Sequence, residues 1–360
     1  MRLSRKKRDD YFWGYLLIAP VTLGLAVFYF YPFFQVVIDS FYKISAFDRR
    51  MGFVGLKNYV DLLSDDEMWQ TMANTFKYVV VIVPVTIAGS LGIAMLLNTK
   101  VKGLSAFRVI YFLPAVTSAA AVSLVWRWIF SGDFGIVNAV LNSFGLDSVQ
   151  WLNGKDTAIY CICCVAIWSN IGYYMIILLA GLQGISKDYY EAAQLDGATP
   201  FQQFRKITLP LLTPSLFYVM IMLIISTFQT FDGIYLMIGT KSAATKYAQS
   251  MVMYFYRIAF DYSNKGYASA IAVFLFLIIM LITLFQMKMQ KKWSTTIERR
   301  QCYAEENQEK SPGPFPGLCH FDHWCVCGTV SLYLDDPDFL QGCGRSHAHP
   351  THDFPGNASL

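Results

Sequence analysis

The stretch from Tyr267 to Met287, YASAIAVFLFLIIMLITLFQM, contains no charged residue. A helix needs about 20 mostly apolar residues to cross the roughly 30 Å of hydrocarbon in a bilayer, so this stretch predicts a transmembrane helix. Working outward along the chain, five more stretches meet the same requirement. The six predicted spans are Phe12–Ile38, Phe76–Leu97, Phe107–Phe130, Ala158–Leu182, Leu211–Ile238 and Tyr267–Met287.

The composition agrees with an integral membrane protein. Of the 360 residues, 55% are apolar and 15% are charged, and the apolar residues gather in blocks. Strands of a membrane barrel would be about half as long as these blocks and would alternate apolar with polar residues. The sequence therefore predicts an all-α fold, a polytopic membrane protein with six transmembrane helices. The first block is too long for a cleaved signal peptide and is interrupted by Pro20 and Pro32, so we interpret it as a retained anchor.

The placement of lysine and arginine predicts the orientation. Loops on the cytoplasmic side of a membrane carry an excess of these residues. The N-terminus and three of the segments that follow spans are short and basic, whereas the other loops mix their basic residues with aspartate and glutamate. We expect both termini to face the cytoplasm of an inner or plasma membrane. The basic residues concerned are Arg2, Arg5, Lys6, Lys7, Arg8, Lys100, Lys102, Arg108, Lys187, Arg205, Lys206, Lys288, Lys291 and Lys292.

A polar segment, residues 183–210, interrupts the membrane pattern between the fourth and fifth spans. Its centre reads YYEAAQLDGATPFQQFRKITLP from Tyr189 to Pro210. Asp188, with Glu191 three residues later, predicts a capped helix start, and Gly197 predicts the helix end because glycine readily adopts a positive φ. Thr199 followed by proline predicts a second start. We expect two short helices joined by a glycine, either lying in the membrane interface or docking into a cytoplasmic partner.

This segment carries a specific family pattern. Glu-Ala-Ala is followed after three residues by Gly, and after nine more by Ile-x-Leu-Pro. The pattern resembles the signature loop of the membrane subunits of binding-protein-dependent ABC importers. The resemblance implies that this loop couples the chain to cytoplasmic ATP-binding subunits. The residues that match are Glu191, Ala192, Ala193, Gly197, Ile207, Leu209 and Pro210.

The resemblance extends over residues 10–290 and is to the sugar permeases of the maltose and glycerol-3-phosphate type. It rests on Gly55-Leu56-Lys57-Asn58-Tyr59, Asn74-Thr75, Phe231-Asp232-Gly233-Ile234-Tyr235, Ala259-Phe260 and Gly266-Tyr267-Ala268-Ser269-Ala270. The chain departs from the family where many relatives carry Gly-Gly-Pro, because residues 239–242 read Gly-Thr-Lys-Ser. The resemblance implies one half of a pore, completed by a second permease subunit, for a carbohydrate delivered by an extracytoplasmic binding protein.

No phosphate-binding Gly-x-x-x-x-Gly-Lys-Ser/Thr motif occurs in the chain. We therefore expect no cofactor to be bound by this chain and ATP to be used by a partner subunit. No catalytic triad, paired carboxylates or metal cluster is recognisable within the predicted bundle, so the chain is predicted not to be an enzyme. We also expect no nucleic-acid partner. An importer of glycerol phosphate esters is an alternative, and an ATP-independent secondary transporter or channel is a second one from a different class.

Polar residues within predicted spans are candidates for the solute path, because burying them in a membrane is costly. Gln229, Asp232 and Tyr235 recur at three-residue spacing, which predicts one helical face with hydrogen-bonding groups and a ring on which a sugar could stack. Contact of Asp232 with water, or of Gln229 with a neighbouring helix, is the alternative. Trp126 and Arg127 are a second candidate pair, for which interfacial anchoring is the alternative.

The sequence changes character after residue 295. Residues 296–360 contain all five histidines and are rich in Pro, Gly and Asp, without a clear helical or strand period. Disorder is one interpretation. A frame-shifted translation is another, since a one-nucleotide slide of the back-translated segment permits a reading that resembles the start of a second permease. The cysteine and histidine spacing near Cys319 matches no zinc pattern, so we expect no metal site. The predicted organisation is thus a basic segment 1–10, a permease domain 11–295 and an atypical tail 296–360.

Overall fold

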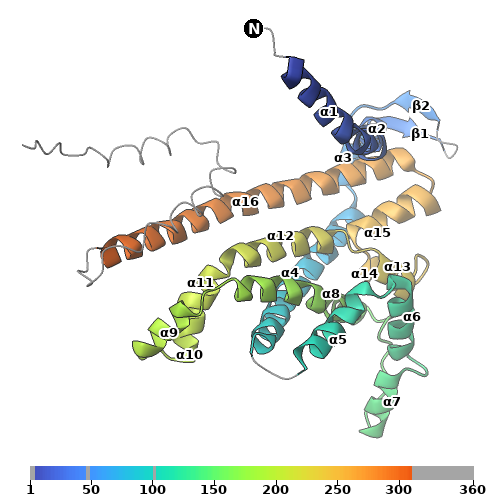
Figure 1. Ribbon diagram of the computed structural model, residues 1–360. Helices are drawn as coiled ribbons and strands as arrows, with labels where there is room; N and C mark the ends of the chain where they lie inside the picture. The colour runs from blue at the N-terminus through green and yellow to red at the C-terminus, as the bar shows by residue number, and fades with distance from the viewer. Residues whose placement is uncertain (1–4, 46–48, 100–102, 310–360) are drawn as a thin grey trace, which may run out of the picture. The chain divides into compact units, whose positions relative to one another are not determined.

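The structure of the chain, a computed structural model, describes residues 5–45, 49–99 and 103–309, with side chains for residues 13–290 of those ranges. The chain divides into two compact units, residues 1–297 and 298–360, and the fold described here is that of the first. Its described residues are mostly helical, as the composition predicts (Figure 1).

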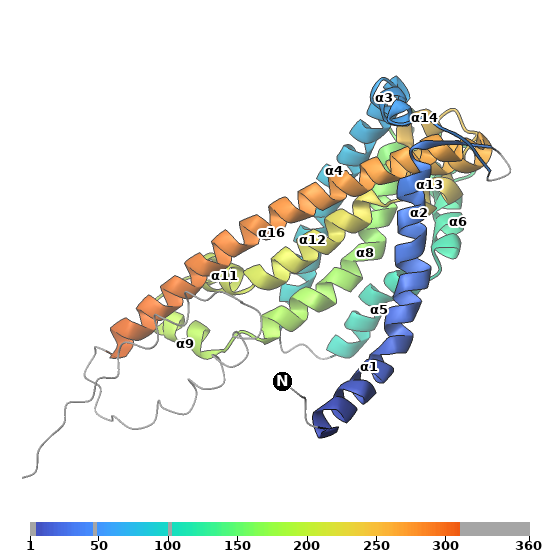
Figure 2. The same ribbon diagram turned by 90° about the horizontal axis from the view of Figure 1, so that it is seen from above.

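The first predicted span forms two helices that are joined without a break. α1 (Arg5–Leu25) passes through a π-helical turn, Ala26–Phe30, into α2 (Tyr31–Asp39). Pro20 lies inside α1, and a second proline follows the first residue of α2. In the most apolar 18-residue window of Trp13–Asp39, no residue is buried within the chain. Figure 2 shows this span at the edge of the bundle.

A small β-hairpin and a short helix connect the first span to the second. Strand β1 (Tyr42–Ile44) pairs antiparallel with β2 (Arg50–Phe53), and α3 (Lys57–Leu63) follows. The sequence analysis predicts no strand, so the expectation of a wholly α-helical chain is wrong at this hairpin. The cross-strand ring contact between Tyr42 and Phe53, with centroids 5.4 Å apart, stabilises the pairing.

The core forms around two long helices, α4 (Asp66–Leu97) and α8 (Ala158–Gln183). Tyr78 of α4 and Leu178 of α8 have no exposed surface and belong to one apolar cluster. Small residues allow the helices to approach closely. The Oγ of Ser90 on α4 donates a 2.9 Å hydrogen bond to the carbonyl oxygen of Ile171 on α8, a type of contact that holds helices together in membranes.

Two of the predicted spans are not continuous helices. The predicted span 107–130 consists of α5 (Leu104–Val116) and α6 (Ala119–Ile129), which meet at 93°. Thr117 has extended backbone angles, φ −77° and ψ 144°, which end α5. Among the described residues, four helices are long and apolar enough to cross a membrane, and the number reaches six only if each bent pair is one span.

The predicted span 211–238 is also interrupted. α12 (Thr213–Phe228) ends before Gln229, and α13 (Asp232–Met237) starts again three residues later. The hydroxyl of Ser250 donates a 2.5 Å hydrogen bond to the carbonyl oxygen of Thr230. This contact satisfies a backbone group that the break releases, which is the condition for irregular backbone at membrane depth.

The remaining helices are short connections and one long final helix. Both views show the final helix running alongside α12 (Figures 1 and 2). It continues past Thr296, where the sequence predicts that regular structure ends. These elements are α7 (Ile136–Ser143), α14 (Thr245–Ala248), α15 (Met251–Tyr256), the π-helical turn Arg257–Asp261 and α16 (Lys265–Glu309).

Candidate functional site

The segment between α8 and α12 folds as two helical pieces. The first is α9 (Asp188–Leu195), and the second comprises α10 (Pro200–Gln203), the π-helical turn Phe204–Thr208 and α11 (Leu209–Leu211). This second piece is bent by 66° against α12. The segment therefore joins the bundle through a sharp corner rather than through a flexible linker.

α9 ends as the sequence predicts, at a glycine. Gly197 has a φ of 74°, the left-handed region that glycine adopts without steric cost. Its N–H donates to the carbonyl oxygen of Gln194 at 3.0 Å, and the N–H of Ala198 donates to that of Ala193 at 2.9 Å. These two bonds form a Schellman motif, which satisfies carbonyl groups at the helix end and fixes the direction of the next piece.

The starts of the two pieces differ from the prediction in one respect. Thr199 begins α10 with a full capping box, in which its N–H donates to Gln202 Oε1 at 2.8 Å and its hydroxyl accepts the Gln202 N–H at 3.4 Å. The predicted capping box of Asp188 with Glu191 is wrong. Asp188 is already the first residue of α9, and its N–H donates instead to the hydroxyl of Ser186 at 3.3 Å.

The two pieces are tied to each other. The hydroxyls of Tyr190 and Thr208 lie 3.0 Å apart, and Gln203 Nε2 donates to the carbonyl oxygen of Ala198 at 3.1 Å. Thr208 is buried although it belongs to a loop with many exposed residues. The two pieces are therefore fastened to each other near the corner before α12.

The loop presents apolar side chains to its surroundings. Leu195 is 90% exposed, Phe201 is 70% exposed and Tyr189 is 53% exposed. Glu191 and Ala192 are also exposed, so a carboxylate and a small side chain lie on the same short helix as Tyr189 and Leu195. Large apolar side chains on an otherwise charged segment are typical of a contact site for another protein.

A cavity of about 280 Å³ lies where both helix breaks meet α8. Hydroxyl and amide groups line it together with small and apolar residues. Asn170 Nδ2 donates to the carbonyl oxygen of Ala166 within its own helix, which leaves its amide oxygen available. The sequence analysis missed this site, although adjacent serine and asparagine within a predicted span are a signal for it. The polar lining residues are Thr117, Ser123, Ser169, Asn170, Tyr173 and Thr230.

The break after α12 separates Gln229 from Asp232 and Tyr235, so the prediction that all three residues lie on one helical face is wrong, although Asp232 and Tyr235 keep their three-residue spacing on α13. Gln229 follows the end of α12, and Asp232 is the exposed first residue of α13. Tyr235 stacks on Phe231 with ring centroids 5.2 Å apart, and its ring edge meets Tyr256 at the same distance. An aromatic cluster thus replaces the predicted row.

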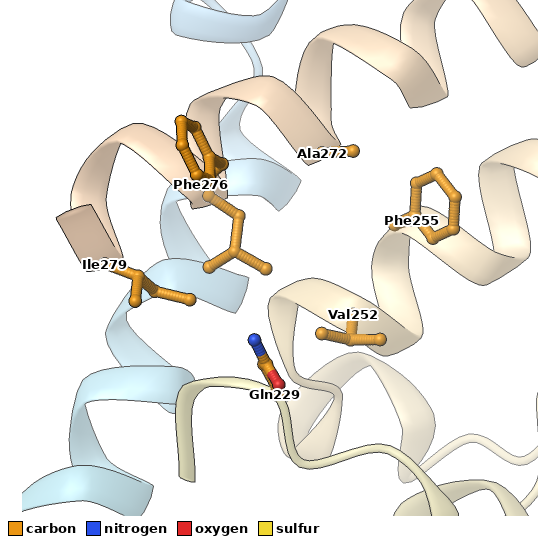
Figure 3. A pocket seen from close by; sticks show the side chains of 7 residues that line it. Gln229, Val252, Phe255, Ala272, Phe276 and Ile279 are labelled. Carbon is orange, nitrogen blue, oxygen red and sulfur yellow. The ribbon is translucent and has the colours of Figure 1, made fainter. Parts of the chain in front are cut away.

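Gln229 points into a second cavity, of about 290 Å³, with mostly apolar walls (Figure 3). Val252 and Phe255 of α15 form one side, and Phe276 and Ile279 of α16 form the other. Gln229 does not line the first cavity, the one at the two helix breaks. Its neighbour Thr230 lines that cavity instead.

Trp126 and Arg127, the second candidate pair for the solute path, lie in different environments. Trp126 packs on the core and stacks on Phe130, with ring centroids 5.4 Å apart, and its edge meets Trp168 at 5.5 Å. Arg127 is exposed and, within the described part of the chain, makes no hydrogen bond or ion pair. The structure therefore places Trp126 as a packing residue and leaves the guanidinium group accessible.

A polar network that the sequence analysis missed ties the start of α4 to the segment around α15. The guanidinium of Arg257 donates to Glu67 at 2.8 Å and to Gln249 Oε1 at 2.5 Å, and Gln249 Nε2 donates to Glu67 at 2.9 Å. Burial acts to lower the pKa of Arg257, but its bonds to Glu67 outweigh burial and raise it above its ordinary value.

A carboxylate beside this network is held by two tyrosines. The hydroxyls of Tyr254 and Tyr267 both donate to Asp65, the latter at 2.8 Å. Burial acts to raise the pKa of the Asp65 carboxyl, but these hydrogen bonds, together with those from the backbone N–H groups of Glu67 and Met68, outweigh it and hold the pKa below its ordinary value. Burial and the same carboxylate raise the pKa of Tyr254.

Long apolar helices, broken spans around a polar cavity and a protruding two-helix loop define a multi-pass membrane permease. The family described as "Binding-protein-dependent transport system inner membrane component" matches residues 85–294, and the chain belongs to this family. The predicted resemblance to the membrane subunits of binding-protein-dependent ABC importers is thereby confirmed. The prediction that the chain is a transport component rather than an enzyme is also confirmed.

Relatives of known sequence agree with this membership. The probable ABC transporter permease protein YesP of Bacillus subtilis is 35% identical over 81% of this chain and 95% of the relative. The sulfoquinovosyl glycerol transport system permease protein SmoG of Agrobacterium fabrum is 33% identical over 74% and 87%. The arabinooligosaccharides transport system permease protein AraP of Bacillus subtilis is 33% identical over 76% and 87%.

A solved structure shares the fold. A chain of a bacterial alginate ABC transporter, determined in complex with a periplasmic protein bound to an alginate pentasaccharide, superposes with a TM-score of 0.71. It is 22% identical, and the match covers 81% of this chain and 98% of the other.

Proposed function

We propose that this chain is the membrane permease subunit of an ATP-driven ABC importer and forms half of a pore for a carbohydrate-type solute. The observation that carries the proposal is its 33% identity, over at least 74% of the chain, to SmoG and AraP, whose names state sugar-containing cargoes. We further propose that both termini face the cytoplasm, as the distribution of basic residues favours.

The loop between α8 and α12 is proposed to dock with cytoplasmic ATP-binding subunits. Its exposed Tyr189, Leu195 and Phe201 offer apolar contact, and Glu191 offers a charge to be paired. The Schellman motif at Gly197 fixes the direction of the second piece relative to α9, which supports the proposal that a displacement passes to the corner before α12. The proposed coupling residues are Glu191, Ala192, Ala193, Gly197, Ile207, Leu209 and Pro210.

A second permease subunit is proposed to complete the pore. The span Trp13–Asp39 buries none of its most apolar window within the chain. Its Phe33 touches Phe276 of α16, but exposed rings such as Phe28 and Tyr31 are left for lipid or a partner. An extracytoplasmic binding protein is proposed as the donor of solute. The alginate transporter of similar fold was determined in complex with a periplasmic protein that holds an alginate pentasaccharide, which supports the proposal.

The solute path is proposed to run past the cavity at the two helix breaks. Hydroxyl groups and the Asn170 amide could replace the water around sugar hydroxyls as the solute passes. Tyr235, in its cluster with Phe231 and Tyr256, offers an apolar ring face of the kind on which sugars stack. Gln229, Asp232, Trp126 and Arg127 stay candidates for this path. Family membership favours an importer over a secondary transporter or channel, and Arg127 by itself is a weak basis for a phosphate-ester solute.

Transport by the assembled system tests the proposal. The full-length chain, co-purified with the ATP-binding subunits, second permease and binding protein that its neighbouring genes encode, would be placed in proteoliposomes. We expect uptake of radiolabelled oligosaccharide to require both ATP and the binding protein. Uptake by the purified chain alone, or uptake indifferent to ATP, would contradict the proposal.

A further inference from the structure

The short helix α3 (Lys57–Leu63), with the residues at its two ends, divides into three different faces. At about 100° per residue, Leu56, Val60 and Leu63 fall within roughly 60° of one another around the helix axis. They are 65%, 60% and 52% exposed. An apolar face that another part of the chain does not cover is unusual on a connecting segment.

A second face of α3 attaches it to the rest of the chain. Asn58 Nδ2 donates to the carbonyl oxygen of Ser40 at 2.7 Å, and the hydroxyl of Tyr59 lies 2.6 Å from the Ser40 hydroxyl. Leu62 is fully buried in the cluster formed by α4, α15 and α16. The orientation of α3 about its own axis is therefore set by the protein, which leaves the apolar face pointing outward.

The third face is polar. Lys57, Asp61 and Ser64 are exposed and fall within roughly 60° of one another at the same rotation per residue. The helix thus has a protein-bound face, an apolar face and a polar face side by side. A helix attached to a membrane protein at the boundary between acyl chains and water requires this combination.

The position of α3 along the membrane normal follows from α4. α4 has 32 residues, which corresponds to about 48 Å of helix, well above the roughly 30 Å of the hydrocarbon core. The helix therefore extends beyond the hydrocarbon core, and α3 ends directly before its first turn. The indole of Trp69, 50% exposed, donates from Nε1 to the carbonyl oxygen of Leu63 at 2.9 Å and joins the two helices at this level.

The apolar face of α3 continues into an exposed stripe on α4. Trp69, Phe76 and Val80 occupy positions i, i+7 and i+11, which share one side of a helix, and they are 50%, 42% and 68% exposed. Tryptophan is enriched where apolar and polar layers of a membrane meet. Trp69 stands at the junction between the stripe and α3, as expected for a residue that marks this boundary.

We propose that α3 is an interfacial anchor, lying in the headgroup region with Leu56, Val60 and Leu63 toward the acyl chains. Met51 and Phe53 of strand β2, 67% and 69% exposed, extend the apolar surface toward the hairpin. The anchor holds the connection between the first and second spans at a fixed depth. This inference requires only that the chain spans a membrane, and it is independent of the solute and of ATP-binding partners.

Site-directed spin labelling tests the proposal on the full-length chain in phosphatidylcholine nanodiscs. Single cysteines would replace Val60 and Leu63 on the apolar face, and Lys57 and Asp61 on the polar face as matched controls, with the natural cysteines changed to serine. Collision rates of each nitroxide with oxygen, which partitions into lipid, and with a water-soluble nickel chelate would be compared. All four positions are exposed, so the substitutions leave the packing of α3 intact.

We expect the oxygen-to-nickel ratio at positions 60 and 63 to exceed the ratio at positions 57 and 61 several-fold. Equal ratios, with nickel reaching all four labels, would show an aqueous face and overturn the proposal. Low rates with both reagents at positions 60 and 63 would show a protein-covered face and would also overturn it. The oxygen collision rate at positions 60 and 63 could also be high for the chain alone and fall when the binding protein is added. That result would support the lipid-facing position of the free chain and identify a second contact, with the binding protein.

Discussion

The guanidinium group of Arg257 lies 2.8 Å from the carboxylate of Glu67, although the two residues are 190 positions apart in the chain. The Arg257 side chain is only 14% exposed, so the pair is largely shielded from water on that side. Gln249 bonds to both members. The start of α4 and the segment around α15 are thereby fastened together, and α15 forms a wall of the cavity into which Gln229 points.

Loss of this contact is expected to destabilise the bundle. In Glu67→Ala the buried guanidinium loses its charged acceptor, and we expect a cost of about 1–3 kcal/mol in the free energy of unfolding, the range for a buried polar group that loses its hydrogen-bond partner. Thermal unfolding in detergent measures it. The pair of Arg50 with Asp39 is the control, since the Arg50 side chain is 43% exposed and so more open to water than that of Arg257. Arg50→Ala should cost no more than about 1 kcal/mol. Equal effects of the two substitutions would contradict the structural role of the Glu67 contact.

The lowered pKa of Asp65 predicts a specific dependence on pH. Because the folded state favours the ionised carboxylate, its stabilisation is present above the ordinary pKa of about 4 and is lost as the pH falls through the lower folded pKa. We expect the wild-type midpoint of thermal unfolding to fall more steeply below about pH 5 than that of Asp65→Asn. Asp61→Asn, at an exposed position without a hydrogen bond among the described residues, is the control. Parallel pH profiles for the wild type and Asp65→Asn would refute the assignment.

Rigidity at Gly197 is expected to matter for coupling rather than for folding. Proline cannot adopt the φ of 74° and lacks the N–H that bonds Gln194, so Gly197→Pro should break the Schellman motif. We expect ATP hydrolysis by the assembled transporter to continue while uptake falls several-fold. Gly197→Asn is the matched control, because asparagine tolerates the left-handed region. Normal uptake by the proline variant would count against a coupling role for the loop.

The exposed apolar residues of the loop are expected to serve assembly. Phe201→Ser and Leu195→Ser remove contacts that the chain itself does not use, so the unfolding midpoint should be unchanged while co-purification of the ATP-binding subunits declines. Phe144, 79% exposed near the end of α7, offers a control outside the loop. If Phe144→Ser reduced co-purification as much as Phe201→Ser does, the loss could not be assigned to the loop surface.

A close helix approach gives the sharpest stability prediction. A Cβ atom added at Gly172 of α8 would lie 1.8 Å from the backbone carbonyl oxygen of Tyr111 on α5, which cannot move independently of its helix. Gly172→Ala should therefore separate α5 from α8 and lower the unfolding midpoint. At Gly92 of α4 an added Cβ meets nothing within 4 Å, and Gly92→Ala should be neutral or stabilising by up to about 1 kcal/mol. A tolerated alanine at position 172 would refute this packing.

Much of the permease was open to prediction from the sequence alone. The helical character of the spans follows from runs of apolar residues, because a backbone in hydrocarbon must satisfy its own hydrogen bonds. The end of α9 at Gly197 and the start of α10 at Thr199 were also predicted, since caps depend on residues only a few positions apart. The family followed from the pattern that starts at Glu191, and the comparisons confirm it.

What only the tertiary structure decided involves partners that are distant in the chain. In the break between α12 and α13, the carbonyl oxygen of Thr230 accepts a hydrogen bond from the hydroxyl of Ser250, a partner 20 residues away that local sequence does not reveal. The contact of Arg257 with Glu67, and the exposed face of α3 that includes Val60, likewise depend on how separate segments meet. Apolar periodicity reports burial in lipid and in protein with the same signal, so only the packed chain distinguishes the two.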